Sequence, residues 1–141
     1  MIISVDYDGT IVDDGFPKIG VPKEGAIPVL KALYEDGHRL VLWTCREDEP
    51  GKLYLSQAVN NLEAMGVTLH SVNETHPHDE FRDSELKRKV YADVYIDDKN
   101  FGGFPGWEAV ARDLLKWEHD QYLAAVAKYE VRPYEQAEEI K

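Results

Sequence analysis

Apolar and polar positions alternate along the chain in blocks that predict strands and helices. Apolar runs without a polar face predict buried strands at four places, residues 2–6, 39–44, 67–72 and 93–97. Helices are expected between and after these strands, at residues 24–36, 52–65, 84–91 and 106–129. Strands that alternate with helices are typical of a parallel sheet with helices on both faces. The pattern therefore predicts an α/β fold.

Length and composition are those of one globular domain. The chain has 141 residues, of which 43% are hydrophobic, and this is enough for a single core. We expect the domain to cover residues 1–130. Residues 131–141 are polar and are expected to form a C-terminal tail.

Net charge and cysteine content limit the classes of binding partner and the cellular compartment that we expect. A net charge of -11 argues against nonspecific binding to nucleic acids or anionic membranes, because polyanions repel each other. The single cysteine, Cys45, cannot form an internal disulfide, which fits a reducing cytoplasm. The first apolar run is too short for a signal peptide, and no stretch approaches the roughly 20 apolar residues of a membrane helix. We expect a cytoplasmic protein.

Reactive polar residues follow three of the predicted strands. Asp6 ends the first strand, Thr44 ends the second, and the acidic pair 97–98 ends the fourth. The carboxyl ends of parallel strands meet at one edge of a sheet, and ligands bind there where the strand order reverses. Carboxylates buried together are unfavourable unless a cation lies between them. The strand ends therefore indicate a cation site.

These residues belong to four motifs that resemble those of the haloacid dehalogenase-like superfamily of phosphohydrolases. The first motif is the sequence DYDGT at residues 6–10, directly after an apolar strand. The second, a Thr or Ser that ends the next strand, matches Thr44. The third is an upstream lysine, for which Lys89 is the first choice and Lys87 the second. The fourth is the sequence VYIDD, which ends on Asp97 and Asp98.

The resemblance implies a fold, a reaction and a cofactor. The fold would be a three-layer Rossmann-like sheet with strand order 4-1-2-3. Asp6 would attack phosphorus and form an aspartyl-phosphate, while Asp8 would act as the acid and then as the base. Thr44 and Lys89 would hold the phosphoryl group. Mg²⁺ would be bound by Asp6, the backbone carbonyl of Asp8, Asp97 and Asp98.

Four further residues are expected beside the substrate: Gly9, Thr10, Cys45 and Arg46. The guanidinium fork of Arg46 suits a phosphate or a substrate carboxylate, and a surface ion pair with Glu47 or Asp48 fits the sequence equally well. Cys45 is interpreted as a passive thiol, because a cysteine phosphatase would carry an arginine where position 51 is Gly. His76 and His78 have metal-binding side chains, but a polar loop is the better interpretation.

The spacing of the motifs is too short for a cap domain. Residues 11–22 suffice for a flap only, and residues 73–88 are also too few for a domain. A capless phosphatase with an open site is therefore expected, acting on a phosphorylated substrate that is most simply a small molecule. The predicted helix at 106–129 is compatible with packing on the sheet or with a homo-oligomer contact.

Two other classes of function compete with a phosphatase. A catalytically weak protein of the same fold would bind a phosphate ligand or act in regulation. A response-regulator domain would accept phosphate on an Asp after its third strand, but that strand here ends in Val72 and Asn73. The order of the motifs therefore argues against a response regulator.

Overall fold

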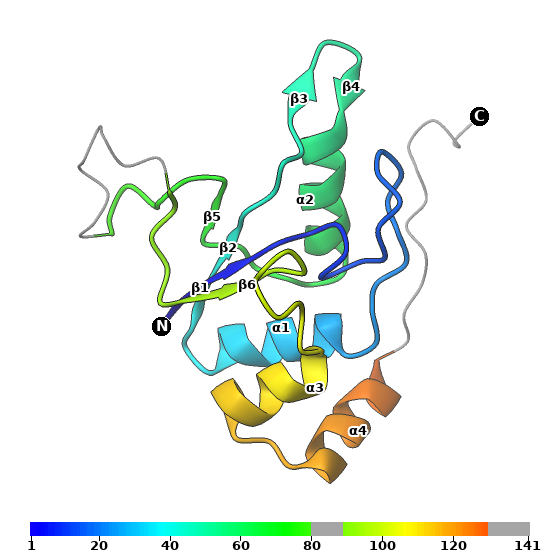
Figure 1. The fold of residues 1–141 in the computed structure, drawn as a ribbon, viewed down its shortest axis with the longest axis vertical. Helices are drawn as coiled ribbons and strands as arrows, with labels where there is room; N and C mark the ends of the chain where they lie inside the picture. Colours follow the sequence, from blue (N-terminus) through cyan, green and yellow to red (C-terminus); the bar gives the residue numbers. More distant parts are fainter. Residues whose placement is uncertain (80–88, 130–141) are drawn as a thin grey trace.

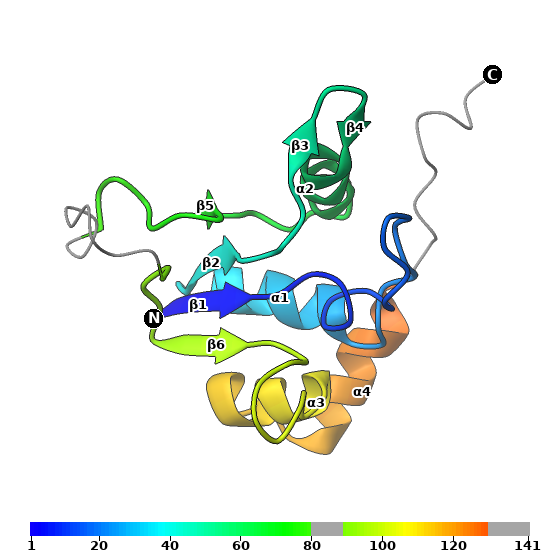
Figure 2. The same cartoon turned by 45° about the horizontal axis from the view of Figure 1, so that its top comes forward.

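Four parallel strands form the centre of the protein. In a computed structural model, which describes residues 1–79 and 89–129, they are β1 (Ile2–Val5), β2 (Arg39–Leu42), β5 (Ser71–Val72) and β6 (Val94–Ile96). They lie in the order β5-β2-β1-β6, as Figure 2 shows from the side of the sheet. The sheet and its helices agree with the Rossmann-like α/β class predicted from the sequence.

Neighbouring strands β1 and β6 bring two acidic residues to the same edge of the sheet. Val5 pairs with Ile96, and the N–H of Asp6 continues the ladder by donating to the Ile96 carbonyl at 2.9 Å. The residues that come directly after the two strands, Asp6 and Asp97, therefore begin side by side. On its other side β1 pairs with β2, so the strand order reverses beside Asp6.

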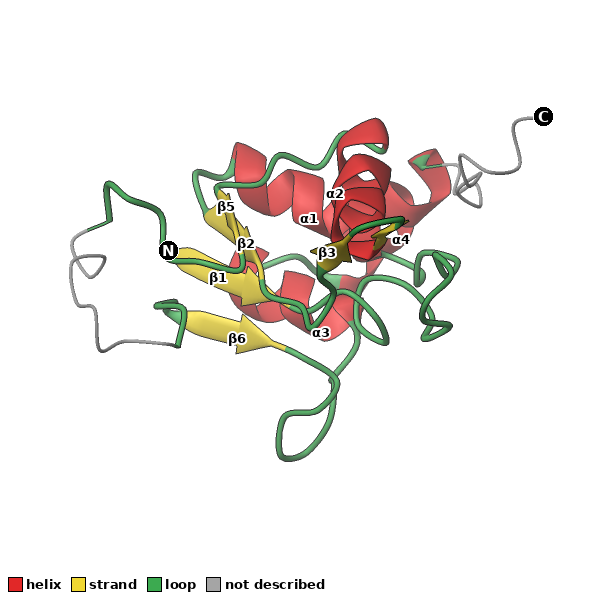
Figure 3. Ribbon diagram, turned by 90° about the horizontal axis from the view of Figure 1, so that it is seen from above, coloured by secondary structure: helices red, strands yellow, loops and turns green. Residues whose placement is uncertain are grey.

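Helix α1 (Ala26–Glu35) provides the main apolar contact of the sheet. It contacts β2 and also the later helix α3 (Trp107–Val110), and Figures 1 and 3 show these elements packed together. In the apolar stripe that helical spacing predicts, Tyr34 is exposed, whereas Val29, Leu30 and Leu33 are buried. They share one core with alternate residues of the two central strands, among them Ile3, Val5, Leu40 and Leu42.

Helix α2 (Tyr54–Ala64) matches its predicted position, but a feature that the sequence did not reveal precedes it. Two short antiparallel strands, β3 (Asp48–Glu49) and β4 (Lys52–Leu53), form a hairpin above the carboxyl edge of the sheet (Figure 1). The hairpin is too short to show apolar alternation, which explains why the sequence pattern does not predict it.

The prediction of one helix over residues 106–129 is wrong. The chain forms α3, then a π-helical turn η1 (Ala111–Leu115), and then a separate helix α4 (His119–Lys128). The break lies at Lys116, whose φ is 60°, and a capping box between Glu118 and Gln121 begins the new helix. After the change of direction α4 contacts α1, and Tyr122 is buried next to Gly25, which directly precedes α1.

Two predictions fall partly or wholly beyond the described residues. Of the helix expected at 84–91, only residues 89–91 are described, and they are not helical. The expected tail, 131–141, lies outside the described ranges. Among the described helices, none has the length and apolar character needed to cross a membrane.

Candidate active site

Three carboxylates converge at the carboxyl edge of the sheet, where β1 and β6 end. Asp6, Asp97 and Asp98 each place a carboxylate oxygen within 4.8 Å of those of the other two. All three side chains are partly buried. The structure thus brings together three of the four acidic residues predicted for the metal site, although Asp6 and Asp97 lie 91 residues apart in the chain. The fourth, Asp8, was expected to contribute its backbone carbonyl, and this stays a prediction.

The ionisation of Asp6 reflects this crowding. Burial, the nearby charge of Asp97 and a hydrogen bond with Asp98 together raise the pKa of Asp6 from 3.8 to about 7. A divalent cation would relieve this repulsion. Three carboxylates without a nitrogen or sulfur ligand suit a hard cation such as Mg²⁺, so the donor set fits the cofactor expected from the resemblance.

Thr10 joins the two acidic motifs. Its hydroxyl donates to Oδ2 of Asp6 at 3.1 Å and accepts the backbone N–H of Asp98 at 2.9 Å. Its carbonyl oxygen accepts the indole N–H of Trp107 at 2.9 Å. Thr10 is fully buried and positions the carboxylates, while its expected contact with a substrate stays a prediction.

Gly9 is needed for a steric reason. Its φ is 87°, and a Cβ atom placed there would lie 2.4 Å from Oδ2 of Asp98. Any larger residue would therefore strain the backbone and displace one of the three carboxylates. Gly9 therefore shapes the loop that follows β1, and its expected position beside a substrate stays a prediction.

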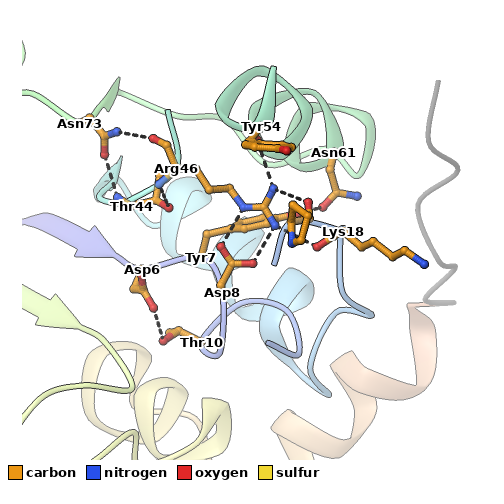
Figure 4. A network of polar contacts seen from close by, with 11 residues as sticks. Asp6, Tyr7, Asp8, Thr10, Lys18, Thr44, Arg46, Tyr54, Asn61 and Asn73 are labelled. Carbon is orange, nitrogen blue, oxygen red and sulfur yellow. Dashed lines mark hydrogen bonds and ion pairs between the residues drawn. The ribbon is translucent and has the colours of Figure 1, made fainter. Parts of the chain in front are cut away.

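Asp8 does not share the orientation of Asp6. As Figure 4 shows, Asp6 points toward Thr10, whereas Asp8 points toward Arg46. The guanidinium of Arg46 donates from Nε to Oδ2 and from Nη2 to Oδ1 of Asp8, both at 2.8 Å. The observed partner of Arg46 is therefore Asp8, and neither of the surface acids Glu47 and Asp48. The guanidinium fork is occupied by this pair and does not face an open position for a phosphate.

The Arg46 side chain is buried, with 1% of its surface exposed, and several segments enclose it. It donates to the carbonyl oxygens of Pro17 and Lys18 in the flap, at 3.2 and 2.9 Å, and to that of Tyr54 at 3.3 Å. The aromatic rings of Tyr7 and Phe16 lie 5.2 and 5.1 Å from its guanidinium carbon. Arg46 therefore links the flap and α2 to Asp8.

Thr44 lies two residues after the end of β2, at the carboxyl edge where the sequence predicts it, and Asn73 holds it there. The Oδ1 atom of Asn73 accepts the backbone N–H of Thr44 at 2.7 Å. The hydroxyl of Thr44 accepts the N–H of Arg46 at 3.1 Å, and the intervening Cys45 is exposed. Sequence patterns carry little signal for Asn73, whose φ of 56° is the left-handed conformation that asparagine tolerates.

The motif lysine stays a prediction. Lys89 is exposed, and its ammonium lies 4.6 Å from the centroid of the Tyr95 ring. Among the described residues, the Lys89 ammonium contacts this ring, and its expected approach to Asp6 is not observed. The second choice, Lys87, lies outside the described ranges.

Comparison with known proteins gives one informative match. No family model and no curated protein matches the chain. A solved structure, that of a conserved protein coded by a locus of Bacteroides thetaiotaomicron, is 34% identical in sequence. The match covers 87% of this chain and 96% of that protein, with a TM-score of 0.72.

Proposed function

This chain belongs to the family of the conserved Bacteroides thetaiotaomicron protein, and we propose that it is a Mg²⁺-dependent phosphohydrolase. The proposal makes it a small capless member of the haloacid dehalogenase-like superfamily. The observation that carries it is the convergence of Asp6, Asp97 and Asp98 where the strand order reverses. An acidic protein needs a cation to receive an anionic phosphate ester, and this cluster supplies its ligands.

Asp6 is the proposed nucleophile. The hydroxyl of Thr10 fixes the carboxylate by donating to its Oδ2 atom, which limits rotation of the side chain. Attack of an Asp6 oxygen on phosphorus breaks the ester P–O bond and forms an aspartyl-phosphate. Bound Mg²⁺ would neutralise charge on the phosphoryl group, with Asp6, Asp97, Asp98 and the Asp8 carbonyl as its protein ligands.

Asp8 is the proposed proton carrier, and Arg46 determines how it acts. A guanidinium offers only donors, so the observed pair fits the ionised carboxylate, which can take a proton from the water that attacks the aspartyl-phosphate. To protonate the leaving oxygen in the first half-reaction, Asp8 must first carry a proton and give up at least one bond to Arg46. Arg46 is therefore a positioning residue.

Residues at the end of β2 are proposed to hold the phosphoryl oxygens. Because the Thr44 oxygen already accepts the Arg46 N–H, its own hydroxyl proton can be donated to the substrate. The exposed Cys45 contributes its backbone and a small side chain at the rim. Lys89 or Lys87 is proposed to supply the positive charge of the third motif.

The substrate is proposed to be a small phosphate monoester that enters an open site. The flap at 11–22 and the hairpin formed by β3 and β4 are short, and neither is a cap domain. A cytoplasmic location agrees with the single cysteine, and a homo-oligomer is compatible with the proposal.

One observation favours a second candidate, a weakly catalytic protein that binds a phosphate ligand or regulates another protein. Both oxygens of Asp8 are engaged by Arg46, and a proton carrier held in this way turns over slowly unless the flap moves. This candidate predicts Mg²⁺-dependent ligand binding without product.

Hydrolysis of p-nitrophenyl phosphate, and then of a panel of phosphate monoesters, tests the proposal with and without Mg²⁺. We expect activity that requires Mg²⁺ and that Asp6→Asn abolishes, while Asp120→Asn, a change at an exposed site in α4, keeps it. Absence of product from every ester, together with Mg²⁺-dependent binding of phosphate, would support the second candidate. Full activity of Asp6→Asn would remove Asp6 as the nucleophile.

A further inference from the structure

A second cluster of metal-binding side chains lies at the opposite edge of the sheet. His70 directly precedes β5, and the loop after β5 brings His76 and Asp79 back toward it. Asp79 also contacts Arg39, the first residue of β2. Because the strands are parallel, this edge is the amino edge, away from Asp6 (Figure 1).

The distances in the cluster match those between ligands that share one metal ion. His70, His76 and Asp79 each offer a ligand atom within 4.8 Å of the others. The Nε2 atom of His70 lies 3.2 and 3.3 Å from the two oxygens of Asp79. Two ligands bound to one tetrahedral Zn²⁺ at about 2.0–2.1 Å are separated by about 3.3 Å.

Burial makes a cation at this position favourable. The Asp79 side chain is 3% exposed, so its charge has lost most of its contact with water. The Asp79 carboxylate contacts Nε2 of His70 and Nη1 of Arg39, each at 3.2 Å. The Arg39 side chain is 58% exposed and can move into solvent when a metal ion takes its place.

His76 is held close to His70 by ring stacking. The two imidazole rings are 4.1 Å apart between centroids, with an angle of 24° between their planes. The Nδ1 atom of His76 also accepts the backbone N–H of His78 at 3.2 Å. Coordination of a metal through Nδ1 would replace this hydrogen bond, whereas coordination through Nε2 would leave it in place.

We propose that His70, His76 and Asp79 bind one Zn²⁺ ion. Two neutral imidazoles and a carboxylate favour Zn²⁺ over Mg²⁺, which prefers oxygen ligands, so this site differs in chemistry from the cluster at Asp6. The three protein ligands leave the fourth tetrahedral position for water. The ion would join the start of β5 to the loop at 73–79, and its expected role is to stabilise this edge of the sheet.

Zn²⁺ titration of metal-free protein tests the proposal. The measurement uses a chromophoric chelator as competitor and saturating Mg²⁺ to fill the carboxylate cluster. We expect the wild type to bind one equivalent of Zn²⁺, and His70→Gln or His76→Gln to lose affinity at least tenfold, whereas His119→Gln in α4 retains it. Co²⁺ in place of Zn²⁺ should give the visible absorption of a tetrahedral site in the wild type and in His119→Gln, but not in His70→Gln.

Two results would overturn the inference. One is a wild type that takes up no equivalent of Zn²⁺ under these conditions, which would leave Arg39 and His70 as the sufficient partners of Asp79. The other is binding that survives His70→Gln and is lost in Asp97→Asn, which would place the ion at the carboxylate cluster. Thermal unfolding excludes misfolding as the cause of a loss: Zn²⁺ should raise the Tm of the wild type but not of a folded His70→Gln protein.

Discussion

Arg46 and Asp8 form a bidentate ion pair across the carboxyl edge of the sheet, with both hydrogen bonds 2.8 Å long. The pair joins the second and first motifs of the proposed active site. It also places the proposed proton carrier under the control of an arginine that is anchored to the flap. Stability and turnover should therefore both depend on Arg46.

Arg46→Met should destabilise the protein strongly and slow turnover. The change removes the hydrogen bonds to Asp8 and to three carbonyl oxygens, and breaking a buried pair typically costs about 3–5 kcal/mol. Urea unfolding measures the loss. The matched control is Arg112→Met, because its pair with Asp113 is exposed to solvent and should contribute little to stability. Equal losses in the two variants would show that burial of Arg46 has no energetic consequence.

Asp97→Asn should weaken Mg²⁺ binding without unfolding the protein. Removing one of three converging charges lowers the attraction for the cation, and we expect affinity to fall by about tenfold or more. Calorimetric titration of the metal-free protein gives the affinity, with Asp120→Asn as the control. If Asp97→Asn binds Mg²⁺ as tightly as the control does, the proposed ligand set is wrong.

Metal-free protein should lose stability as the pH rises from about 4 to about 7. Asp6, with its pKa raised to about 7, holds a proton in the folded state that the unfolded chain has already released. The folded state thus binds more protons in this window, so the free energy of unfolding falls with pH. Thermal denaturation at several pH values should show this slope in the wild type and a smaller one in Asp6→Asn.

The same proton competes with the metal. Mg²⁺ should therefore bind more tightly at about pH 8 than at about pH 5.5, because Asp6 must ionise before it can act as a ligand. An affinity independent of pH in this range would contradict the assignment of Asp6 as a ligand. Binding of Mg²⁺ at the His70 cluster would not explain this pH dependence, since Mg²⁺ disfavours imidazole ligands.

Gly9→Ala should lower the free energy of unfolding more than the same change at another glycine of similar backbone conformation. At Gly37, φ is 94° and a Cβ atom meets nothing within 4 Å, so only backbone strain of about 1–2 kcal/mol is expected. At Gly9 the strain is accompanied by the collision with Asp98. Urea unfolding compares the two variants, and Mg²⁺ titration should show weaker binding only in Gly9→Ala. Identical behaviour would mean that Asp98 moves away without consequence.

Local sequence signals predicted the elements with large apolar faces. The run at residues 2–6 and the helical spacing of Val29, Leu30 and Leu33 both correspond to observed elements in the core, although Tyr34 of the same predicted stripe is exposed. The prediction of one helix over residues 106–129 was wrong because a continuous apolar pattern does not show where the chain must turn. The turn at Lys116 accompanies the burial of Tyr122 next to Gly25, a contact between distant segments that the local pattern does not show.

The sequence by itself determined the α/β class and which acidic residues directly follow the strands. An apolar strand that stops at Asp6, and another that stops at Asp97, must place those carboxylates at the edge where parallel strands end. Tertiary structure alone decided the partner of Asp8, because Arg46 reaches it across 38 residues of chain. The same is true of Asn73 at Thr44 and of the approach of His70 to Asp79. These contacts depend on how loops fold back over the sheet, which no local pattern of residues encodes.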